Sequence, residues 1–177
     1  MKTFRKTLIS FLSTAVGGLT GKKIGHRMDN QAMEIEKSVP EATVQRVGEG
    51  IDVEFTGNVL FVYDVSVLSE DAKINLDKLV AILKTYLDTN IEVLGYTDDK
   101  GTEAYNKSLS QRRVGSVSGY LISKGIDSNR IKTEGFGESA PKYDNINEDG
   151  SSHNRRVEFL ITANQKMKAE AEKETVQ

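Results

Sequence analysis

The 177-residue chain contains no cysteine and no tryptophan, two prolines and two histidines. Without cysteine it can form neither disulfides nor thiolate metal sites, and it has no cysteine nucleophile. The histidines, His26 and His153, lie far apart in the sequence, which argues against a zinc site, and no cofactor is expected. A long apolar run is also missing, because the N-terminal run over residues 8–19 is shorter than the about 20 residues that a transmembrane helix needs.

The chain has no large charge excess either. Its formal net charge of −2 gives no general attraction to nucleic acid, whose binding domains are usually basic, so no nucleic-acid partner is expected. Apolar residues make up 37% of the chain and charged residues 28%, which is enough for a normal core. The length suits one ordinary domain with extensions.

Basic residues crowd the start of the chain around the apolar run, a pattern typical of an export signal. Residues 13–15, Ser-Thr-Ala, offer a small-residue cleavage site for a secretory signal peptide, and an uncleaved anchor is the alternative. The basic residues are Lys2, Arg5, Lys6, Lys22, Lys23 and Arg27.

Glycine recurs every four residues at Gly17, Gly21 and Gly25. On a helix this spacing lines one face and permits close helix packing in a membrane, whereas a flexible leader is the other interpretation. We therefore expect residues 1–37 to be an export signal or a membrane-associated glycine-zipper segment. Residues 38–50, which contain a proline and a pair of glycines, are expected to form a linker.

The globular domain is expected over residues 51–163, followed by a charged tail, 164–177, that is a frayed helix or disordered. Alternating apolar residues predict strands, and Ser69 predicts a helix cap before a stripe of leucines. A hairpin followed by α-β-α-β-β predicts an α+β fold, a split β-α-β sandwich with two main helices packed against a sheet of mixed direction. The expected strands are 51–55, 59–63, 91–94, 131–136 and 156–162, and the helices are 69–88 and 102–124.

The second helix carries an arginine, Arg113, on its apolar face. Because positions four apart share a face, its neighbours on that stripe are apolar or aromatic. A guanidinium there is costly unless an anion satisfies it. An internal salt bridge with Glu158 or Asp98 would do so, and so would a ligand carboxylate bound in bidentate form. The stripe consists of Tyr105, Leu109, Arg113, Val117 and Leu121.

Asp98 follows the strand that precedes this helix. An aspartate in such a place most often forms an Asx turn or caps the helix, but Asp99 could take that role and leave Asp98 to bind an ammonium group. A ligand with an ammonium and a carboxylate would suit Asp98 and Arg113 together. Arg113 lies roughly 16 Å along the helix at about 1.5 Å per residue, so we expect loop 97–101 to fold back over the helix.

Three motifs, in order, make the sequence resemble the OmpA C-terminal-like peptidoglycan-binding domain. They are TDDKGTEAYNKSLSQRRVGSVSGYLISKGI, RIKTEGFGESAP and NRRVEF, and the resemblance spans residues 51–161. The leader GGLTGKKIGHRMDNQ is similar, more weakly, to the glycine-zipper segment that precedes this domain in some envelope proteins.

The resemblance implies non-covalent binding of peptidoglycan through the diaminopimelate of its stem peptide, which would tether the cell envelope to the wall. The matching motifs place the key aspartate at Asp98 and the key arginine at Arg113, with Asn106 and Arg155 as further contacts or supports. Where the family commonly has alanine after the helix arginine, this chain has Val114, which could crowd the helix. The implied location is the envelope of a Gram-negative-type bacterium, at the outer membrane or in the periplasm. The sequence does not predict the oligomeric state.

The sequence also permits functions other than binding. Asp98, Asp99 and Glu103 cluster, and paired carboxylates can hydrolyse glycosides, but their place at a turn suits capping, so an enzyme is not expected. The domain could also be the wall anchor of a larger envelope machine, although such proteins usually carry a clear transmembrane helix before it. A module that has lost ligand binding would have no need to retain both Asp98 and Arg113.

Overall fold

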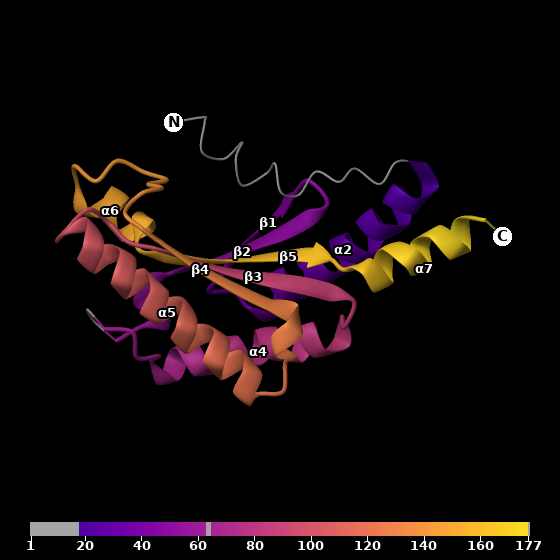
Figure 1. Ribbon diagram of the computed structural model, residues 1–177, viewed down its shortest axis with the longest axis horizontal. Helices are drawn as coiled ribbons and strands as arrows, with labels where there is room; N and C mark the ends of the chain where they lie inside the picture. The colour runs from indigo at the N-terminus through magenta and orange to yellow at the C-terminus, as the bar shows by residue number, and fades with distance from the viewer. Residues whose placement is uncertain (1–17, 63–64, 177) are drawn as a thin grey trace.

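The computed structural model describes residues 18–62 and 65–176 (Figure 1). The signal-like run up to residue 17, which includes the cleavage site at residues 13–15 and Gly17, lies outside the described residues. Within the described ranges, no helix is both long enough and apolar enough to cross a membrane.

A five-stranded sheet of mixed direction forms the centre of the domain, in the order β1-β2-β5-β3-β4. β3 and β4 are parallel, and the other neighbours are antiparallel. A parallel pair needs a long crossover, which α5 provides, so the predicted α+β sandwich is confirmed. The strands are β1 (Thr43–Val47), β2 (Gly50–Thr56), β3 (Thr89–Tyr96), β4 (Ile131–Gly137) and β5 (Arg156–Ala163). The helices are α2 (Gly18–Ser38), α3 (Gly57–Leu60), α4 (Glu70–Thr85), α5 (Glu103–Ser123), α6 (Glu148–Asn154) and α7 (Gln165–Thr175).

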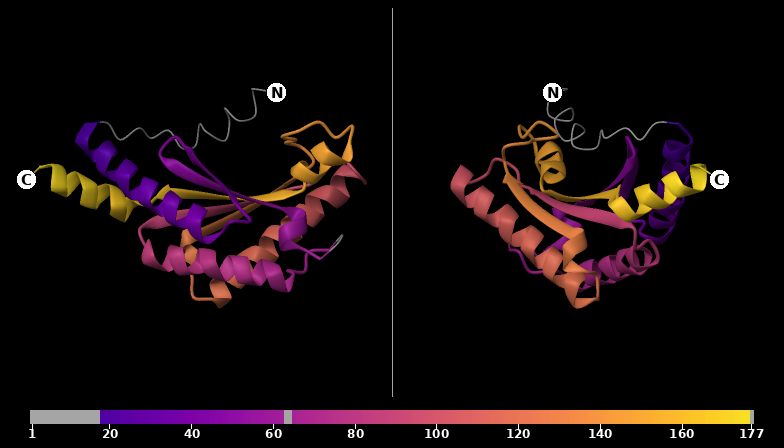
Figure 2. Two further views of the ribbon diagram at one scale, coloured as in Figure 1. Left: turned by 180° about the vertical axis from the view of Figure 1, so that it is seen from behind. Right: turned by 45° about the vertical axis from the view of Figure 1, so that its right-hand side comes forward.

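The helices α4 and α5 cover one face of the sheet (Figures 1 and 2). Strand residues alternate between the two faces, and Phe55 and Phe159 point toward the helices, fully buried and packed edge to face with ring centres 5.7 Å apart. The predicted cap is confirmed, because Ser69 Oγ accepts a hydrogen bond from the Ala72 N–H at 3.0 Å. At the end of α5, Gly125 has the left-handed φ of 92° expected of a helix terminator.

α5 lies close to β3 and β4 because these strands carry glycine beneath it. A Cβ atom at Gly135 would stand 2.6 Å from Ser110 Oγ, and one at Gly95 would stand 2.7 Å from a methyl carbon of Val114. Ser110 Oγ also accepts a hydrogen bond from the Gly137 N–H at 2.9 Å, which ties the helix to β4. Val114, expected to crowd the helix, is buried in the space that Gly95 leaves.

Two expectations at the start of the domain are wrong. The linker predicted over residues 38–50 contains β1, which pairs antiparallel with β2. The strand predicted over residues 59–63 is replaced by α3, which follows β2 directly. The reason is that β2 already pairs with β1 on one side and with β5 on the other, so no edge is open to a returning strand.

The loop predicted from residue 141 to 153 also differs, because its second half forms α6. Asn147 caps this helix by accepting a hydrogen bond from the Gly150 N–H at 2.8 Å. Two acids, Glu148 and Asp149, occupy the first turn.

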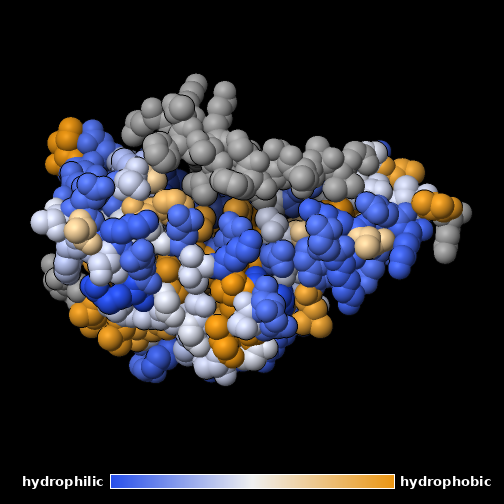
Figure 3. Space-filling view, viewed as in Figure 1, coloured by the Kyte–Doolittle hydropathy of each residue, from blue (hydrophilic) through white to orange (hydrophobic). Residues whose placement is uncertain are grey.

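The N-terminal helix and the tail form a helix pair at one end of the molecule (Figure 2). α2 buries Ile24, Met28 and Ile35 in the main core, and α7 buries Met167 and Ala171. Of the two interpretations of the tail, the structure therefore has a helix. The outer surface of the pair is mostly hydrophilic (Figure 3).

Charged contacts join the same two helices. Arg27 of α2 bonds to Asp88 at 2.9 Å and to Glu170 of α7 at 3.4 Å. At Gly25, the second of the repeated glycines that the structure describes, an added Cβ would meet nothing within 4 Å, so the described elements do not require a glycine there.

Candidate functional site

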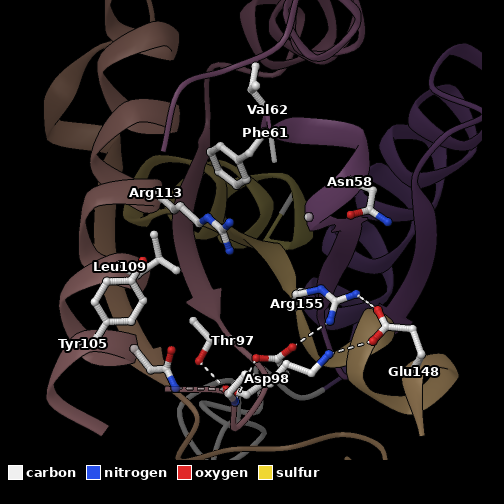
Figure 4. Close-up of a pocket in the computed structure, with 13 residues that line it drawn as sticks. Asn58, Phe61, Val62, Thr97, Asp98, Tyr105, Leu109, Arg113, Glu148 and Arg155 are labelled. Atoms are coloured by element: carbon white, nitrogen blue, oxygen red, sulfur yellow. Dashed lines mark hydrogen bonds and ion pairs between the residues drawn. The ribbon is translucent and has the colours of Figure 1, made fainter. Parts of the chain in front are cut away.

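A pocket of about 340 Å³ opens beside the first half of α5, and all four predicted site residues line it (Figure 4). Asp98 comes from the loop after β3, Asn106 and Arg113 from α5, and Arg155 from the turn before β5. The remaining lining residues are Gly57, Asn58, Phe61, Val62, Thr97, Lys100, Tyr105, Leu109 and Glu148.

Asp98 is buried, and both of its carboxylate oxygens accept hydrogen bonds. Oδ2 accepts from Arg155 Nη1 at 2.6 Å, and Oδ1 accepts from the Lys100 N–H at 3.1 Å. The turn role expected of Asp99 thus falls to Asp98 itself, and the helix cap is Thr102, whose hydroxyl accepts from the Tyr105 N–H. Each carboxylate oxygen can accept a further bond, so these contacts orient the group without saturating it.

Asn106 fixes the loop that carries Asp98. Its fully buried side chain donates from Nδ2 to the Asp98 carbonyl at 3.3 Å and also to Glu138. The Thr97 hydroxyl donates to the same carbonyl at 2.8 Å. Asn106 therefore supports the site as well as lining it.

Arg113 reaches the pocket from the middle of α5 and is 7% exposed. Its Nε donates to the Val65 carbonyl at 3.2 Å, and its guanidinium carbon lies 5.0 Å from the centre of the Phe61 ring, a cation–π contact. Figure 4 shows the guanidinium pointing toward the centre of the pocket, with Arg155 and Glu148 across from it.

The two acids considered as salt-bridge partners of Arg113 have close partners of their own. Asp98 bonds to Arg155, and Glu158 accepts from Arg156 Nε at 2.7 Å on the other face of the sheet. Asp98 and Arg113 nevertheless line one cavity.

Arg155 links Asp98 to two residues that sequence reasoning missed, Glu148 and Lys100. Its Nη2 bonds to Glu148, which also accepts from Lys100 Nζ at 2.8 Å. Burial lowers the pKa of Arg155, but hydrogen bonds to Asp98 and Glu148 outweigh it and raise the pKa overall. Hydrogen bonds from Lys100 and then Arg155 lower the pKa of Glu148 to about 2.

The two arginines of the Asn-Arg-Arg motif lie on opposite faces of the sheet. Asn154, fully buried, accepts hydrogen bonds from the Lys142 and Tyr143 N–H groups at 2.8 and 2.9 Å and so holds the preceding loop. Arg155 then faces the pocket. Arg156 faces the opposite side, with its guanidinium carbon 3.8 Å from the centre of the Tyr96 ring.

A second charged cluster lies on that opposite face, outside the pocket. Carboxylate oxygens of Asp52, Glu54 and Glu158 all lie within 4.8 Å of one another. Lys142 pairs with Glu54 and Arg156 pairs with Glu158, so two of the three acids are compensated. Asp52 Oδ1 has no hydrogen-bond partner in the described part of the chain.

The fold and the pocket agree with an OmpA-like domain. The OmpA family profile matches residues 60–155, 96 of the 177 residues, and the chain belongs to this family.

Curated relatives extend the likeness over most of the chain. The probable lipoprotein YiaD of Escherichia coli is 33% identical over 144 residues, which cover 80% of this chain and 66% of the relative. Outer membrane protein A of Bordetella avium is 42% identical over 114 residues, which cover 64% of this chain and 59% of the relative. The chain thus spans two thirds or less of the length of these two relatives. The relatives place it in the envelope of a Gram-negative-type bacterium, at the outer membrane or in the periplasm.

Solved structures share the fold. A putative MotB-like protein from Desulfovibrio vulgaris superposes with a TM-score of 0.75 at 23% identity, covering 81% of this chain and 95% of that one. The peptidoglycan-associated lipoprotein from Burkholderia pseudomallei superposes with a TM-score of 0.55 at 25% identity, covering 59% of this chain and 88% of that one.

Proposed function

We propose that this protein binds peptidoglycan non-covalently through the diaminopimelate of the stem peptide and so tethers the envelope to the wall. The observation that carries the proposal is one pocket lined by a buried carboxylate and a buried guanidinium, Asp98 and Arg113. The free end of diaminopimelate carries an ammonium and a carboxylate. Asp98 accepts hydrogen bonds from the ammonium, and Arg113 donates to the carboxylate. The Burkholderia lipoprotein is named as peptidoglycan-associated, which supports peptidoglycan as the polymer that this domain binds.

The expected affinity of one pocket is modest. A hydrogen bond to a charged group contributes about 1.5–3 kcal/mol, and only two such contacts bind the ammonium and the carboxylate of the ligand. Many copies held in one envelope and facing one insoluble polymer supply avidity. The function needs no bond cleavage, and we propose a binder and not a hydrolase. Incubation with sacculi should accordingly release no muropeptides.

A tether also needs an attachment on the envelope side, which we assign to the N-terminal segment, residues 1–37. α2 buries its apolar stripe in the domain, so the proposal places any membrane contact before α2, in residues 1–17. Cell fractionation with N-terminal sequencing of the mature protein distinguishes a cleaved export signal from a retained membrane anchor within residues 1–17.

The binding proposal is tested by co-sedimentation with purified sacculi. The double variant Asp98→Ala with Arg113→Ala should stay in the supernatant, because each substitution removes one charged contact to the ligand. Matched controls are the exposed neighbours Asp99→Ala and Arg112→Ala, which should pellet like the wild type. A folded double variant that pellets normally would overturn the proposal.

A further inference from the structure

Four charged residues at the Asp98 end of the pocket form one continuous series of ion pairs. Arg155 Nη1 lies 2.6 Å from Asp98 Oδ2, and Arg155 Nη2 bonds to Glu148. Glu148 in turn pairs with Lys100 Nζ at 2.8 Å. Two acids and two cations make the sum of these four charges zero.

The sum matters because the proposed ligand brings an ammonium group to this end. The side chains of Asp98 and Arg155 are 8% and 22% exposed, so solvent screens their interaction only in part. With Arg155 and Lys100 present and Glu148 removed, the four-residue series would become cationic and would repel the ammonium. Glu148, with its pKa of about 2, keeps its negative charge throughout the physiological range.

A second effect of Glu148 concerns the geometry of the contact between Arg155 and Asp98. A guanidinium prefers to grip a carboxylate with two parallel hydrogen bonds, which would occupy both oxygens of Asp98. Here Glu148 takes one terminal nitrogen of Arg155, and a single bond reaches Asp98. Both oxygens of Asp98 therefore keep the capacity to accept from a ligand.

We propose that Glu148 is a positioning residue that makes the Asp98 end of the pocket selective for an ammonium group, acting through Arg155 and by balancing the charge of Lys100. This inference rests on the proposed function and names the residue that sets its specificity. Glu148 and Lys100 are each 66% exposed, so the effect is partly screened and is expected to be about threefold to fivefold in affinity.

The test uses two soluble probes and isothermal titration calorimetry. One probe is the tripeptide L-Ala-D-Glu-meso-diaminopimelate, and the other is the same tripeptide with the ammonium at the free end of diaminopimelate acetylated. Glu148→Gln should weaken binding of the first probe about threefold to fivefold and leave binding of the second unchanged. Lys100→Met should strengthen binding of the first probe by a similar factor. The double variant should return to the wild-type affinity.

The controls separate this inference from the binding proposal. Asp149→Asn, an exposed acid of the same helix, should change neither affinity. An equal loss for both probes in Glu148→Gln, or no recovery when Lys100→Met is added, would show a merely structural role and overturn the inference. A wild type that binds neither probe would overturn the proposed function as well. Failure of Lys100→Met alone to strengthen binding would contradict the charge balance even if Glu148→Gln did not fold.

Discussion

The carboxyl group of Asp52 lies among acids on the face of the sheet opposite the long helices, where two cations serve three carboxylates. Burial first, and then the neighbouring Glu158 and Glu54, raise its pKa from 3.8 to about 7. The folded protein thus holds this proton more tightly than the unfolded chain does. The free energy of unfolding contributed by Asp52 therefore falls as the pH rises from about 4 to about 7.

Replacing Asp52 with its neutral isostere should remove that pH dependence. We expect Asp52→Asn to raise the free energy of unfolding by roughly 1–3 kcal/mol at pH 8, where the wild type carries the buried charge. At pH 4 both proteins are neutral at this position, and the difference should disappear. Urea unfolding at the two pH values measures the free energy of unfolding of both proteins. Equal stabilisation at both pH values would show that packing, and not charge, explains the effect of Asp52→Asn.

Single residues show where sequence reasoning succeeds and where it ends. The motifs singled out Asp98, Asn106, Arg113 and Arg155, and the structure gathers all four around one pocket. Their proposed roles stay predictions. Glu148 gave no such signal, because its contact to Lys100 joins segments 48 residues apart and its contact to Arg155, seven residues away, depends on how α6 ends against β5.

At the scale of elements, the contact between α5 and the parallel strands determines where the site lies. Gly95 and Gly135 let the helix approach, and Ser110 fastens it to β4. Asn106 and Arg113 are carried by the same helix, so their distance from the Asp98 loop depends on this close packing. The glycines thus act on the pocket from outside it.

A methyl group under α5 should be costly. Gly135→Ala would place a Cβ 2.6 Å from Ser110 Oγ, and we expect it to lower the free energy of unfolding by about 1–3 kcal/mol through overpacking, with weaker sedimentation with sacculi. Gly115→Ala is the matched control on α5, where an added Cβ meets nothing within 4 Å. It should stabilise the helix by about 0.5–1 kcal/mol. Similar effects of the two substitutions would contradict the close-packing explanation.

The elements that were predicted correctly have strong local signals, and those that were missed depend on partners. Leucines spaced three and four residues apart and a serine cap identified α4. β1 alternates only weakly and is recognised by its pairing with β2, while α3 replaces a strand because β2 has no free edge. α6 is short and consists mostly of poor helix formers, so its local signals were limited to the asparagine cap and the two acids of its first turn.

At the scale of the whole molecule, α2 and α7 close the sheet at the end away from the pocket (Figure 1). The two helices come from opposite ends of the chain and share the main hydrophobic core through Met28 and Met167. From residue 18 on, the N-terminal segment is therefore a structural part of the domain, and so is the charged tail up to residue 176.

Met167 should hold this helix pair together. Met167→Ala is expected to lower the free energy of unfolding by about 2–4 kcal/mol, because the side chain is fully buried. Met33→Ala, on the exposed side of α2, should change it by less than about 0.5 kcal/mol. Hydrogen exchange should show faster exchange of α2 amides in Met167→Ala, with the pocket unchanged. Faster exchange at the pocket as well would mean that the two ends of the molecule unfold together.

The start of α2 lies at the opposite end of the long axis from α6 and the start of α5, which carry pocket residues, and β2, β5 and β3 run roughly along that axis between them (Figure 1). Under the proposed function, the wall pulls at the pocket and the envelope pulls before α2, so tension acts parallel to the strands. The hydrogen bonds between adjacent strands are then loaded in shear, so many of them must break together before the strands separate. The arrangement suits a link that bears load whenever wall and membrane are drawn apart.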